Sequence, residues 1–337
     1  MSSSNVSKEI IDRGFWKGVS LQERLAYLED IYVKHPAVQA ILSYIEHELE
    51  YRRADGKTTG LLIIAPSGAG KSALIKHLTR SYPKVETEES RTCPVVAFTV
   101  PTVPSPKTMG AALLRAMADI LWDVGTAGKK FDRINKLLTP AKTRLILIDN
   151  FQDIPTRRKS RGILNVATWV RDLCDINFGG IVIALGTAES SKVRDANEQV
   201  QRRLKAKLSL PVFAGSSDDE LKNFARLLKS IEKLLPLAEN SAIYSVGMTK
   251  RMHCATMGNF DYLMTLLKNA ICIAEKHGQE TLTMQTLHDA FAHGHGDYAA
   301  SENPFSPEFL WTNLDQPGQV FHNARFSTDI EEELEAA

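Results

Sequence analysis

The sequence predicts an α/β protein, with a parallel β-sheet covered by helices on both faces and a smaller all-helical domain after it. Short apolar runs alternate with helical patterns through the first two thirds of the chain, which is typical of parallel strands joined by helical crossovers. From about residue 217 the strand signal disappears and only helical periodicity continues. We therefore expect two folded domains in this chain of 337 residues.

Helical periodicity and composition define the domain boundaries. Residues 1–20 are polar and are expected to be flexible. We assign residues 21–214 to an α/β domain with N-terminal helices, which His35-Pro36 interrupts because proline disfavours helix at the residue before it. Residues 215–295 form the predicted helical domain, and residues 296–337 a tail. The tail ends in an acidic run that we expect to be solvated, with a partner-binding peptide as the alternative.

The same patterns predict the individual strands and helices. Strands are expected at residues 61–64, 93–100, 144–149, 180–187 and 208–213. Helices of the first domain are expected at 21–53, 73–78, 107–124, 131–138 and 163–173. Helices of the second domain are expected at 218–234, 242–246, 260–277 and 283–292.

Composition and charge limit the classes of function. The net charge is +1, so any contact with nucleic acid needs a local basic patch. The four cysteines form no CxxC pair and are expected to be thiols of a reducing cytoplasm rather than metal ligands. The first residues lack a signal pattern and no apolar run is long enough for a membrane span, so we expect a cytoplasmic protein without membrane contact.

Residues 61–72 carry the strongest functional signal: an apolar strand, a loop containing glycines and the start of a helix. Backbone N–H groups of such a loop point at phosphate oxygens. Lys71 is predicted to reach the β- and γ-phosphates of ATP, and Ser72 to bind Mg²⁺. The alternative is a chance Gly-Lys-Ser at a helix start. The predicted nucleotide-binding residues are Ala65, Pro66, Ser67, Gly68, Ala69, Gly70, Lys71 and Ser72.

Ala65 stands where the consensus for such loops has glycine. This departure lowers the specificity of the motif, because alanine must avoid the positive φ that glycine tolerates.

The third predicted strand ends at Asp149, whose carboxylate is expected to face Mg²⁺. This expectation assumes that the strand lies beside the strand of the phosphate loop; the alternative is an aspartate that caps a turn. Asn150 occupies the position where a glutamate commonly polarises the attacking water. Because a neutral amide cannot accept a proton, hydrolysis is expected to be slow unless Asp153 substitutes.

Two further residues are candidates for contact with the γ-phosphate. Thr187 ends the fourth strand, where a hydroxyl could contact the phosphate or the water, or could simply belong to a turn. Arg203 precedes the fifth strand and could stabilise charge in the site of a neighbouring subunit. Arg202 is a less favoured candidate for that role, and a solvated basic helix end is the alternative for both.

Two basic segments are candidates for DNA contact, because phosphate recognition needs donors on exposed, preorganised backbone. Lys107 and Thr108 present a cation and a hydroxyl at a predicted helix start. Arg157, Arg158 and Lys159 belong to a run of four cations in six residues. Each segment alone would fit a charged surface loop equally well.

Taken in this order, the segments resemble AAA+ ATPases of the TniB/TnsC transposition-regulator family, from about residue 24 to residue 305. The segments that carry the resemblance are 32–36, 65–72, 100–107, 147–149, 161–165, 185–187, 201–203 and 302–305.

The resemblance implies an AAA+ P-loop NTPase core with a helical lid, which binds ATP and Mg²⁺ and hydrolyses ATP. It implies a homo-oligomer, a ring or a helical filament, on double-stranded DNA in the bacterial cytoplasm. It also implies a link between a transposase and a target-selection factor, for which a CRISPR-associated complex is one candidate. In that family the loop matching Lys107 and Thr108 follows the DNA backbone.

Two departures from the family pattern concern turnover and sensing. Asn150 replaces the usual acidic residue, and the lid around residues 258–261 lacks the arginine that many AAA+ lids direct at the γ-phosphate. Two other functions stay open at this point. One is a signalling or defence ATPase that acts through protein association, and the other is a helicase-loader type of ATPase on single-stranded DNA.

Overall fold

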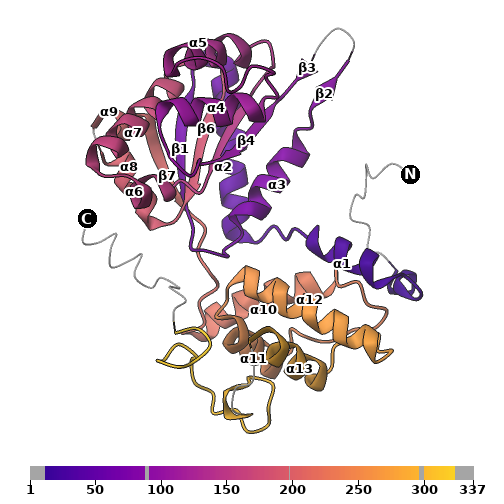
Figure 1. The fold of residues 1–337 in the computed structure, drawn as a ribbon. Coiled ribbons are helices and arrows are strands. Elements are labelled where there is room, and N and C mark those ends of the chain that lie inside the picture. The colour runs from indigo at the N-terminus through magenta and orange to yellow at the C-terminus, as the bar shows by residue number, and fades with distance from the viewer. Residues whose placement is uncertain (1–11, 88–90, 197, 296–299, 323–337) are drawn as a thin grey trace. The chain divides into compact units, whose positions relative to one another are not determined.

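The computed structural model describes residues 12–87, 91–196, 198–295 and 300–322. Within these ranges the chain forms two compact units (Figure 1). The sheet unit comprises Pro36–Pro211. The helical unit comprises residues 12–35 together with residues 212–322.

The sheet unit contains a five-stranded parallel sheet, as predicted. Its order is β4 (Val95–Thr99), β5 (Leu145–Asp149), β6 (Ile181–Gly186), β1 (Thr59–Ile64) and β7 (Leu204–Ser209). Because β6 lies between β5 and β1, the expectation that the Asp149 strand lies beside the phosphate-loop strand is wrong. The last strand begins at Leu204, earlier than predicted, because it pairs along β1 from Gly60 onward.

Eight helices of the described residues surround this sheet. They are α2 (Pro36–Asp55), α3 (Lys71–Ser81), α4 (Pro106–Ala116), α5 (Ala127–Leu138), α6 (Asp153–Arg157), α7 (Ser160–Cys174), α8 (Ser191–Arg194) and α9 (Glu198–Arg203). Two short strands, β2 (Val85–Glu86) and β3 (Arg91–Thr92), form a separate antiparallel pair. The helix predicted to reach residue 124 ends at Ala116, because the chain turns through Ala118, whose φ is +57°.

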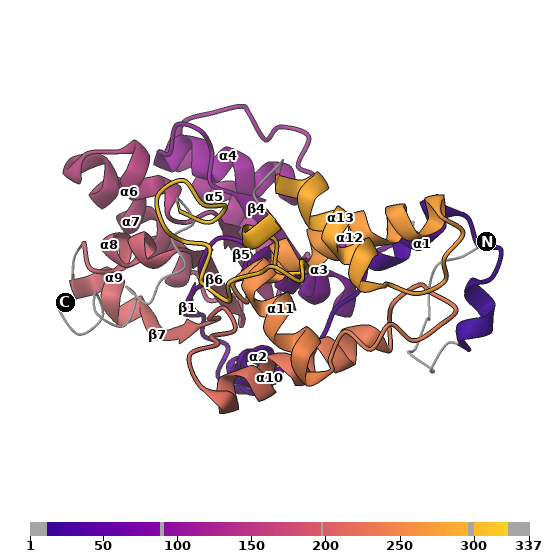
Figure 2. The ribbon, with the colours of Figure 1, turned by 90° about the horizontal axis from the view of Figure 1, so that it is seen from below.

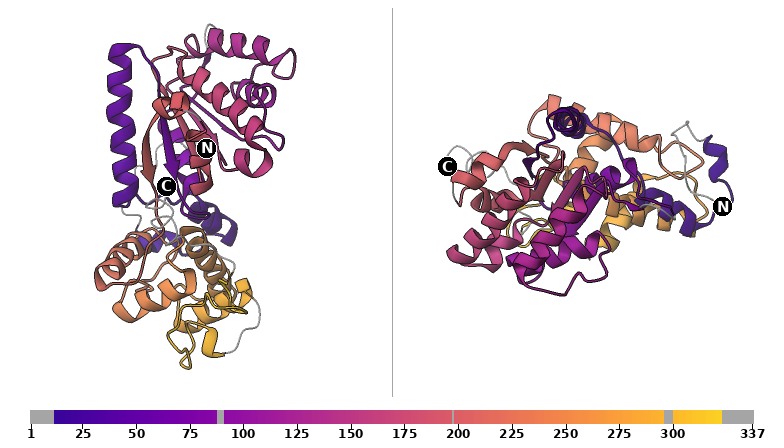
Figure 3. Two further views of the ribbon diagram at one scale, coloured as in Figure 1. Left: turned by 90° about the vertical axis from the view of Figure 1, so that its left-hand side faces the viewer. Right: turned by 90° about the horizontal axis from the view of Figure 1, so that it is seen from above.

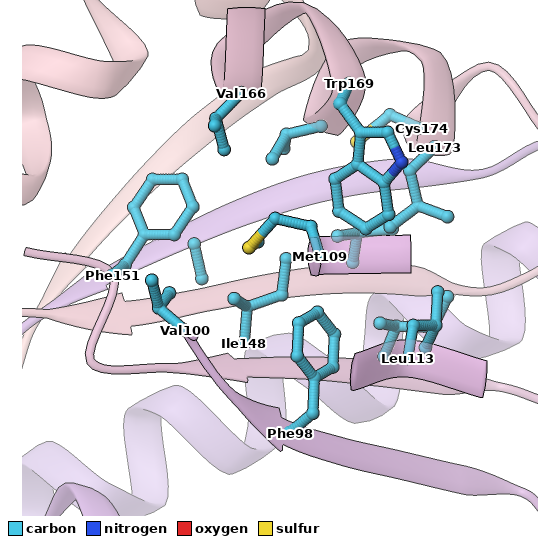
Figure 4. Packing of buried hydrophobic residues seen from close by; sticks show 14 of the residues in the cluster. Phe98, Val100, Met109, Leu113, Ile148, Phe151, Val166, Trp169, Leu173 and Cys174 are labelled. Carbon is cyan, nitrogen blue, oxygen red and sulfur yellow. The ribbon is translucent and has the colours of Figure 1, made fainter. Parts of the chain in front are cut away.

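Helices cover both faces of the sheet, as the near-continuous apolar strands predict. One face packs against α4 and α7, through side chains such as Phe98, Met109, Ile148 and Trp169 (Figure 4). The long helix α2 runs along the sheet together with α3 on the other side (Figure 3). The strands β1, β5 and β6 are consequently buried on both sides, and their carboxyl ends are held in fixed positions.

The helical unit has its own hydrophobic core. Its helices are α1 (Leu21–Glu29), α10 (Asp218–Glu232), α11 (Val246–Thr256), α12 (Phe260–Lys276) and α13 (Met284–His295), with 3₁₀ turns η1 (Arg13–Trp16) and η3 (Ala300–Glu302). The helices α12 and α13 pack against each other (Figure 2). The helix predicted at residues 242–246 instead begins at Val246, because Ala242 adopts a φ of +51°.

Two segments pack differently from the sequence-based division of the chain. The helix α1, which we expected in the nucleotide-binding domain, contributes Leu28 to the core of the helical unit. Beside it, Arg24 is almost fully buried and donates to both carboxylate oxygens of Glu280, at 2.9 and 3.0 Å. Residues 300–322, expected in the tail, place Phe305 and Phe321 in the same core.

The flexible N-terminus and the acidic run predicted from the sequence lie largely or wholly outside the described residues. None of the helices in the described ranges is both long and apolar enough to cross a membrane.

Candidate nucleotide-binding site and adjacent basic surface

The loop after β1 has the geometry of a phosphate cradle. Gly68 and Gly70 adopt φ values of +75° and +101°, which side chains disfavour, and Gly70 is the N-cap of α3. The first N–H groups of α3 therefore point into the loop, together with the positive end of the helix. Ala65 does not adopt a positive φ, and its N–H donates to the carbonyl of Gly186 at 2.9 Å. Alanine is thus accommodated at the position where the consensus has glycine.

Lys71 lies inside this loop with 9% of its surface exposed. Its Nζ donates to the carbonyl oxygens of Ala65 and Pro66, at 2.9 and 2.8 Å. Burial lowers the pKa of Lys71 below its ordinary value, while the charge of Asp149 acts in the opposite direction. Neutral carbonyls compensate a buried ammonium only in part, so the loop favours an anion at this point. The adjacent Ser72 is exposed on the first turn of α3.

These residues fit a nucleotide and its metal ion. Lys71 and the N–H groups of the loop match a polyphosphate, and the Ser72 hydroxyl and the Asp149 carboxylate are oxygen ligands of the kind that Mg²⁺ prefers. Asp149 ends β5 at the same edge of the sheet as the loop, and it is near enough to influence the pKa of Lys71.

Asn150 follows Asp149 in a left-handed conformation, with a φ of +56°. Asparagine is among the few residues that tolerate this region, so the backbone gives one reason for an amide here. The N–H of Asn150 donates to Oδ1 of Asp149 at 2.8 Å. Asp153 pairs with Arg157 at 2.7 Å, which leaves its carboxylate poorly suited to replace a general base.

Thr187 directly follows β6, and its backbone N–H donates to Oε1 of Gln152 at 3.3 Å. The amide nitrogen Nε2 of Gln152 in turn donates to Oδ1 of Asn150 at 3.4 Å. Gln152 therefore links the ends of β5 and β6, a role that sequence reasoning missed. Nothing in its position three residues after Asp149 indicates this link, because it depends on which strand lies next to β5.

Arg203 lies at the opposite edge of the sheet. Its carbonyl oxygen lies beside Gly60, near the amino end of β1, whereas the phosphate loop follows the carboxyl end of that strand. Arg203 Nε donates to Oδ1 of Asp175 at 2.5 Å, and this hydrogen bond raises the pKa of Arg203. Arg202 is more exposed and pairs with Glu198 on its own helix.

The two basic segments predicted to contact DNA lie side by side. Arg158 Nε donates to the carbonyl of Pro104 at 2.7 Å, which ties the loop before α7 to the loop before α4. Lys107 is exposed on the first turn of α4, and the hydroxyl of Thr108 donates to the carbonyl of Val103 at 2.7 Å within a capping box. Thr108 thus stabilises the helix start. Lys107, Arg157 and Lys159 are exposed, whereas Arg158 is partly buried. We call Lys107, Arg157, Arg158 and Lys159 the basic surface.

A family model described as "Bacterial TniB protein" matches residues 24–214 of this chain. No curated protein sequence matches it. Among solved structures, the chain is similar to the Aeropyrum pernix ORC2 protein in its ADP form, with a TM-score of 0.55, 16% identity and coverage of 80% of this chain and 72% of that chain.

Two further solved structures share this similarity. CDC6P from Pyrobaculum aerophilum has a TM-score of 0.55 and 12% identity, covering 89% of this chain and 72% of that chain. Drosophila ORC bound to DNA has a TM-score of 0.51 and 13% identity, covering 88% of this chain and 69% of that chain.

At such low identities these neighbours establish the fold alone, which is that of the AAA+ ATPases with a C-terminal helical domain. The family model covers more than half of the chain, including the whole phosphate loop and the end of β5. The chain therefore belongs to the TniB family.

Proposed function

We propose that this protein is an ATP-dependent regulator of DNA transposition, which oligomerises on double-stranded target DNA and links a target-selection factor to a transposase. The observation that carries the proposal is the position of the basic surface in a chain of the TniB family. It lies next to the edge of the sheet that carries the phosphate loop. In this arrangement nucleotide and DNA would contact neighbouring loops of one rigid unit.

ATP is the nucleotide that the cradle supports, with Lys71 at the β- and γ-phosphates and residues 65–72 around them. Ser72 and Asp149 would hold Mg²⁺, which supplies charge neutralisation between the phosphates when bound. Thr187 would contact the γ-phosphate from the end of β6. Asn150 offers an amide in place of a carboxylate, so we expect slow hydrolysis and a long-lived ATP state.

Arg203 supports assembly into an oligomer. Arg203 lies beside Gly60, five residues before Ala65 at the start of the phosphate loop, which corresponds to about 17 Å of extended chain. Arg203 therefore cannot reach the nucleotide of its own subunit, and a role in hydrolysis requires the site of a neighbour. Arg202 stays as the alternative for this position.

The basic surface supports DNA binding that tolerates any sequence. Each subunit contributes only a few cations, and a chain of net charge +1 would bind duplex weakly as a monomer. A ring or filament repeats the contact at every subunit, which multiplies affinity through effective concentration. One structural neighbour, Drosophila ORC, is bound to DNA in its solved structure. Because the matching family model is bacterial, we place the protein in the bacterial cytoplasm, where the proposed target DNA lies.

Light scattering tests the proposal directly. The full-length protein is measured with ATP or without nucleotide, and with duplex DNA, single-stranded DNA or no DNA, at low and moderate salt. We expect large assemblies only when ATP and duplex are both present, with loss at higher salt. Assemblies on single strands alone would favour a helicase-loader type of ATPase. ATP-bound monomers that ignore both DNAs would favour signalling through protein association.

The partner roles need a second measurement. A DNA-bound, ATP-dependent assembly should retain a transposase and a target-selection factor in a co-sedimentation assay. Retention of neither by an intact assembly would contradict the linking role while leaving the ATPase and DNA-binding roles in place.

A further inference from the structure

Gln152 occupies a position between two of the residues assigned to the nucleotide. It lies at the start of α6, partly exposed at the carboxyl edge of the sheet, and its side chain reaches across to the end of β6. The absence of a side chain at Gly186 makes room for it, since a Cβ there would lie 2.7 Å from Oε1 of Gln152. The close approach indicates a built contact and not a chance one.

A chain of hydrogen bonds crosses this edge from β1 through β6 to β5. The hydrogen bonds run along the strand ends: Lys71 Nζ to the Ala65 carbonyl, Ala65 N–H to the Gly186 carbonyl, Thr187 N–H to Gln152 Oε1, Gln152 Nε2 to Asn150 Oδ1, and Asn150 N–H to Asp149 Oδ1. Every residue in this series of hydrogen bonds belongs to the candidate site or contacts a residue that does.

One backbone group determines which side-chain atoms donate and which accept in this series of hydrogen bonds. The N–H of Thr187 can only donate, so Gln152 must present its carbonyl oxygen to Thr187. Gln152 then presents its NH₂ group to Asn150, and Asn150 must answer with its own carbonyl oxygen. The NH₂ group of Asn150 is thereby directed away from Gln152, as a hydrogen-bond donor.

We infer that Gln152 is a positioning residue that orients the amide of Asn150 as a donor toward the γ-phosphate of bound ATP. The inference rests on the proposed nucleotide function of this site. In this orientation Asn150 donates a hydrogen bond that ATP can accept and ADP cannot. It offers no acceptor that could take a proton from water. The same contact couples Asn150 to the backbone of Thr187, so the ends of β5 and β6 respond to the nucleotide as one element.

Two variants of Gln152 separate this role from simple packing. Gln152→Ala removes the contact and leaves Asn150 free to rotate. Gln152→Glu keeps the shape and still accepts from Thr187, but its carboxylate would draw the NH₂ group of Asn150 toward itself and turn the Asn150 oxygen to the phosphate. If Gln152 only packs, Gln152→Glu should reduce the preference for ATP less than Gln152→Ala does. If Gln152 positions Asn150, Gln152→Glu should reduce this preference at least as much, because the Asn150 oxygen then faces the γ-phosphate.

The measurement is the affinity of the full-length protein for fluorescent ATP and ADP analogues with Mg²⁺. For Gln152→Ala we expect unchanged ADP affinity and about a tenfold loss in the preference for ATP, corresponding to about 1.4 kcal/mol. Gln152→Glu should lose at least as much. Thermal unfolding without nucleotide checks that both variants are folded.

A double-mutant cycle tests whether Gln152 acts through Asn150. Asn150→Gly removes the amide without backbone strain at its positive φ, and in that background Gln152→Ala should have no further effect on the preference for ATP. If both Gln152 variants bind ATP normally and keep the same ratio of ATP affinity to ADP affinity, the inference about Gln152 is wrong, while the proposed nucleotide function stands. Failure of the unaltered protein to bind either analogue would overturn the proposed nucleotide function along with it.

Discussion

At the scale of single residues, the site combines groups whose environments differ. Lys71 is buried against carbonyl oxygens, whereas Lys107 faces solvent. Burial of the Lys71 ammonium costs desolvation free energy that a bound anion would offset. Lys107 stays solvated, so its charge costs little. Substituting each should therefore separate nucleotide binding from DNA binding.

Replacing Lys71 should abolish ATP binding without loss of stability. Lys71→Met retains the volume and removes a buried charge, so we expect the free energy of unfolding of the nucleotide-free protein to stay within about 1 kcal/mol or to rise. Burial lowers the pKa of Lys71 from 10.5, so the charged side chain opposes folding most where it is protonated in both states. Between the folded pKa and 10.5 the folded state binds fewer protons than the unfolded state, and this opposition decreases as the pH rises. The unaltered protein should thus gain stability, relative to Lys71→Met, as the pH rises toward 10.5.

Urea unfolding at neutral and alkaline pH measures this difference, and titration with a fluorescent ATP analogue measures binding. Retention of full ATP affinity by Lys71→Met would contradict the assignment of the phosphate loop.

Replacing Lys107 should weaken DNA binding at every sequence. Lys107→Ala removes one phosphate contact per subunit, so the slope of log K against log salt concentration should fall by about 1 for each bound subunit, while ATP affinity is unchanged. Fluorescence anisotropy with duplexes of unrelated sequence at several salt concentrations measures this. Lys136→Ala, at an exposed position of α5, is the matched control and should leave the slope unaltered. Equal effects of both variants would remove the basic surface from consideration.

At the scale of elements, the helical unit is held by contacts that the sequence pattern does not reveal. The segment around Phe213 packs edge-on against the rings of His35 and lies beside Phe224. His253 contacts the carbonyl of Phe213 at 2.9 Å and crowds Gly215, where a Cβ would lie 2.4 Å from the ring. Residues from the N-terminal segment, from α10 and from α11 thus meet in one half-buried cluster.

This cluster should make the helical unit sensitive to acid. Burial lowers the pKa of His253 below 6.5, and burial likewise lowers the pKa of His35 and of His295. Below pH 6.5 the unfolded chain binds protons that the folded unit does not, so stability should be lost as the pH falls from 6.5 toward the folded pKa values. Thermal unfolding at a series of pH values should show this loss.

Two variants make the test specific. His253→Gln should flatten the dependence on pH, and His277→Gln, at an exposed position, should not. An unfolding temperature that falls equally in the unaltered protein and in His253→Gln would assign the acid sensitivity to other groups.

At the scale of the whole molecule, the sheet separates the nucleotide edge from the edge that carries Arg203. Arg203→Ala should therefore leave ATP binding by the monomer intact and lower the ATPase rate of the DNA-bound assembly, by about 10³-fold if it acts on a neighbour's γ-phosphate. Arg202→Ala, which breaks a pair within α9, separates the two candidates, because only the variant of the arginine that acts in trans should lower the rate.

Mixing complementary variants reveals whether the contact is between subunits. Arg203→Ala and Lys71→Ala are each inactive in this scheme, but their mixture contains interfaces with an intact loop on one side and an intact arginine on the other. Partial recovery of the ATPase rate in the mixture is the expected result. No recovery in assemblies of normal size would contradict action in trans.

Local sequence patterns determined the order of strands and helices, the phosphate loop and the family. These are properties of neighbouring residues: apolar runs, a glycine-containing loop before Lys71-Ser72, and an aspartate at a strand end. They also indicated the two basic segments separately, although their contact through Arg158 and Pro104 joins residues distant in the sequence.

Only the tertiary structure decided which strands are neighbours and which segments share a core. The position of β6 between β5 and β1 depends on how the chain crosses the sheet, and it alone brings Gln152 to Thr187 and Asn150. Likewise, the packing of α1 and of residues 300–322 into the helical unit depends on apolar surfaces that match only after folding. Sequence periodicity shows that a helix has an apolar face to bury. Only the packing of the folded protein shows which surface covers that face.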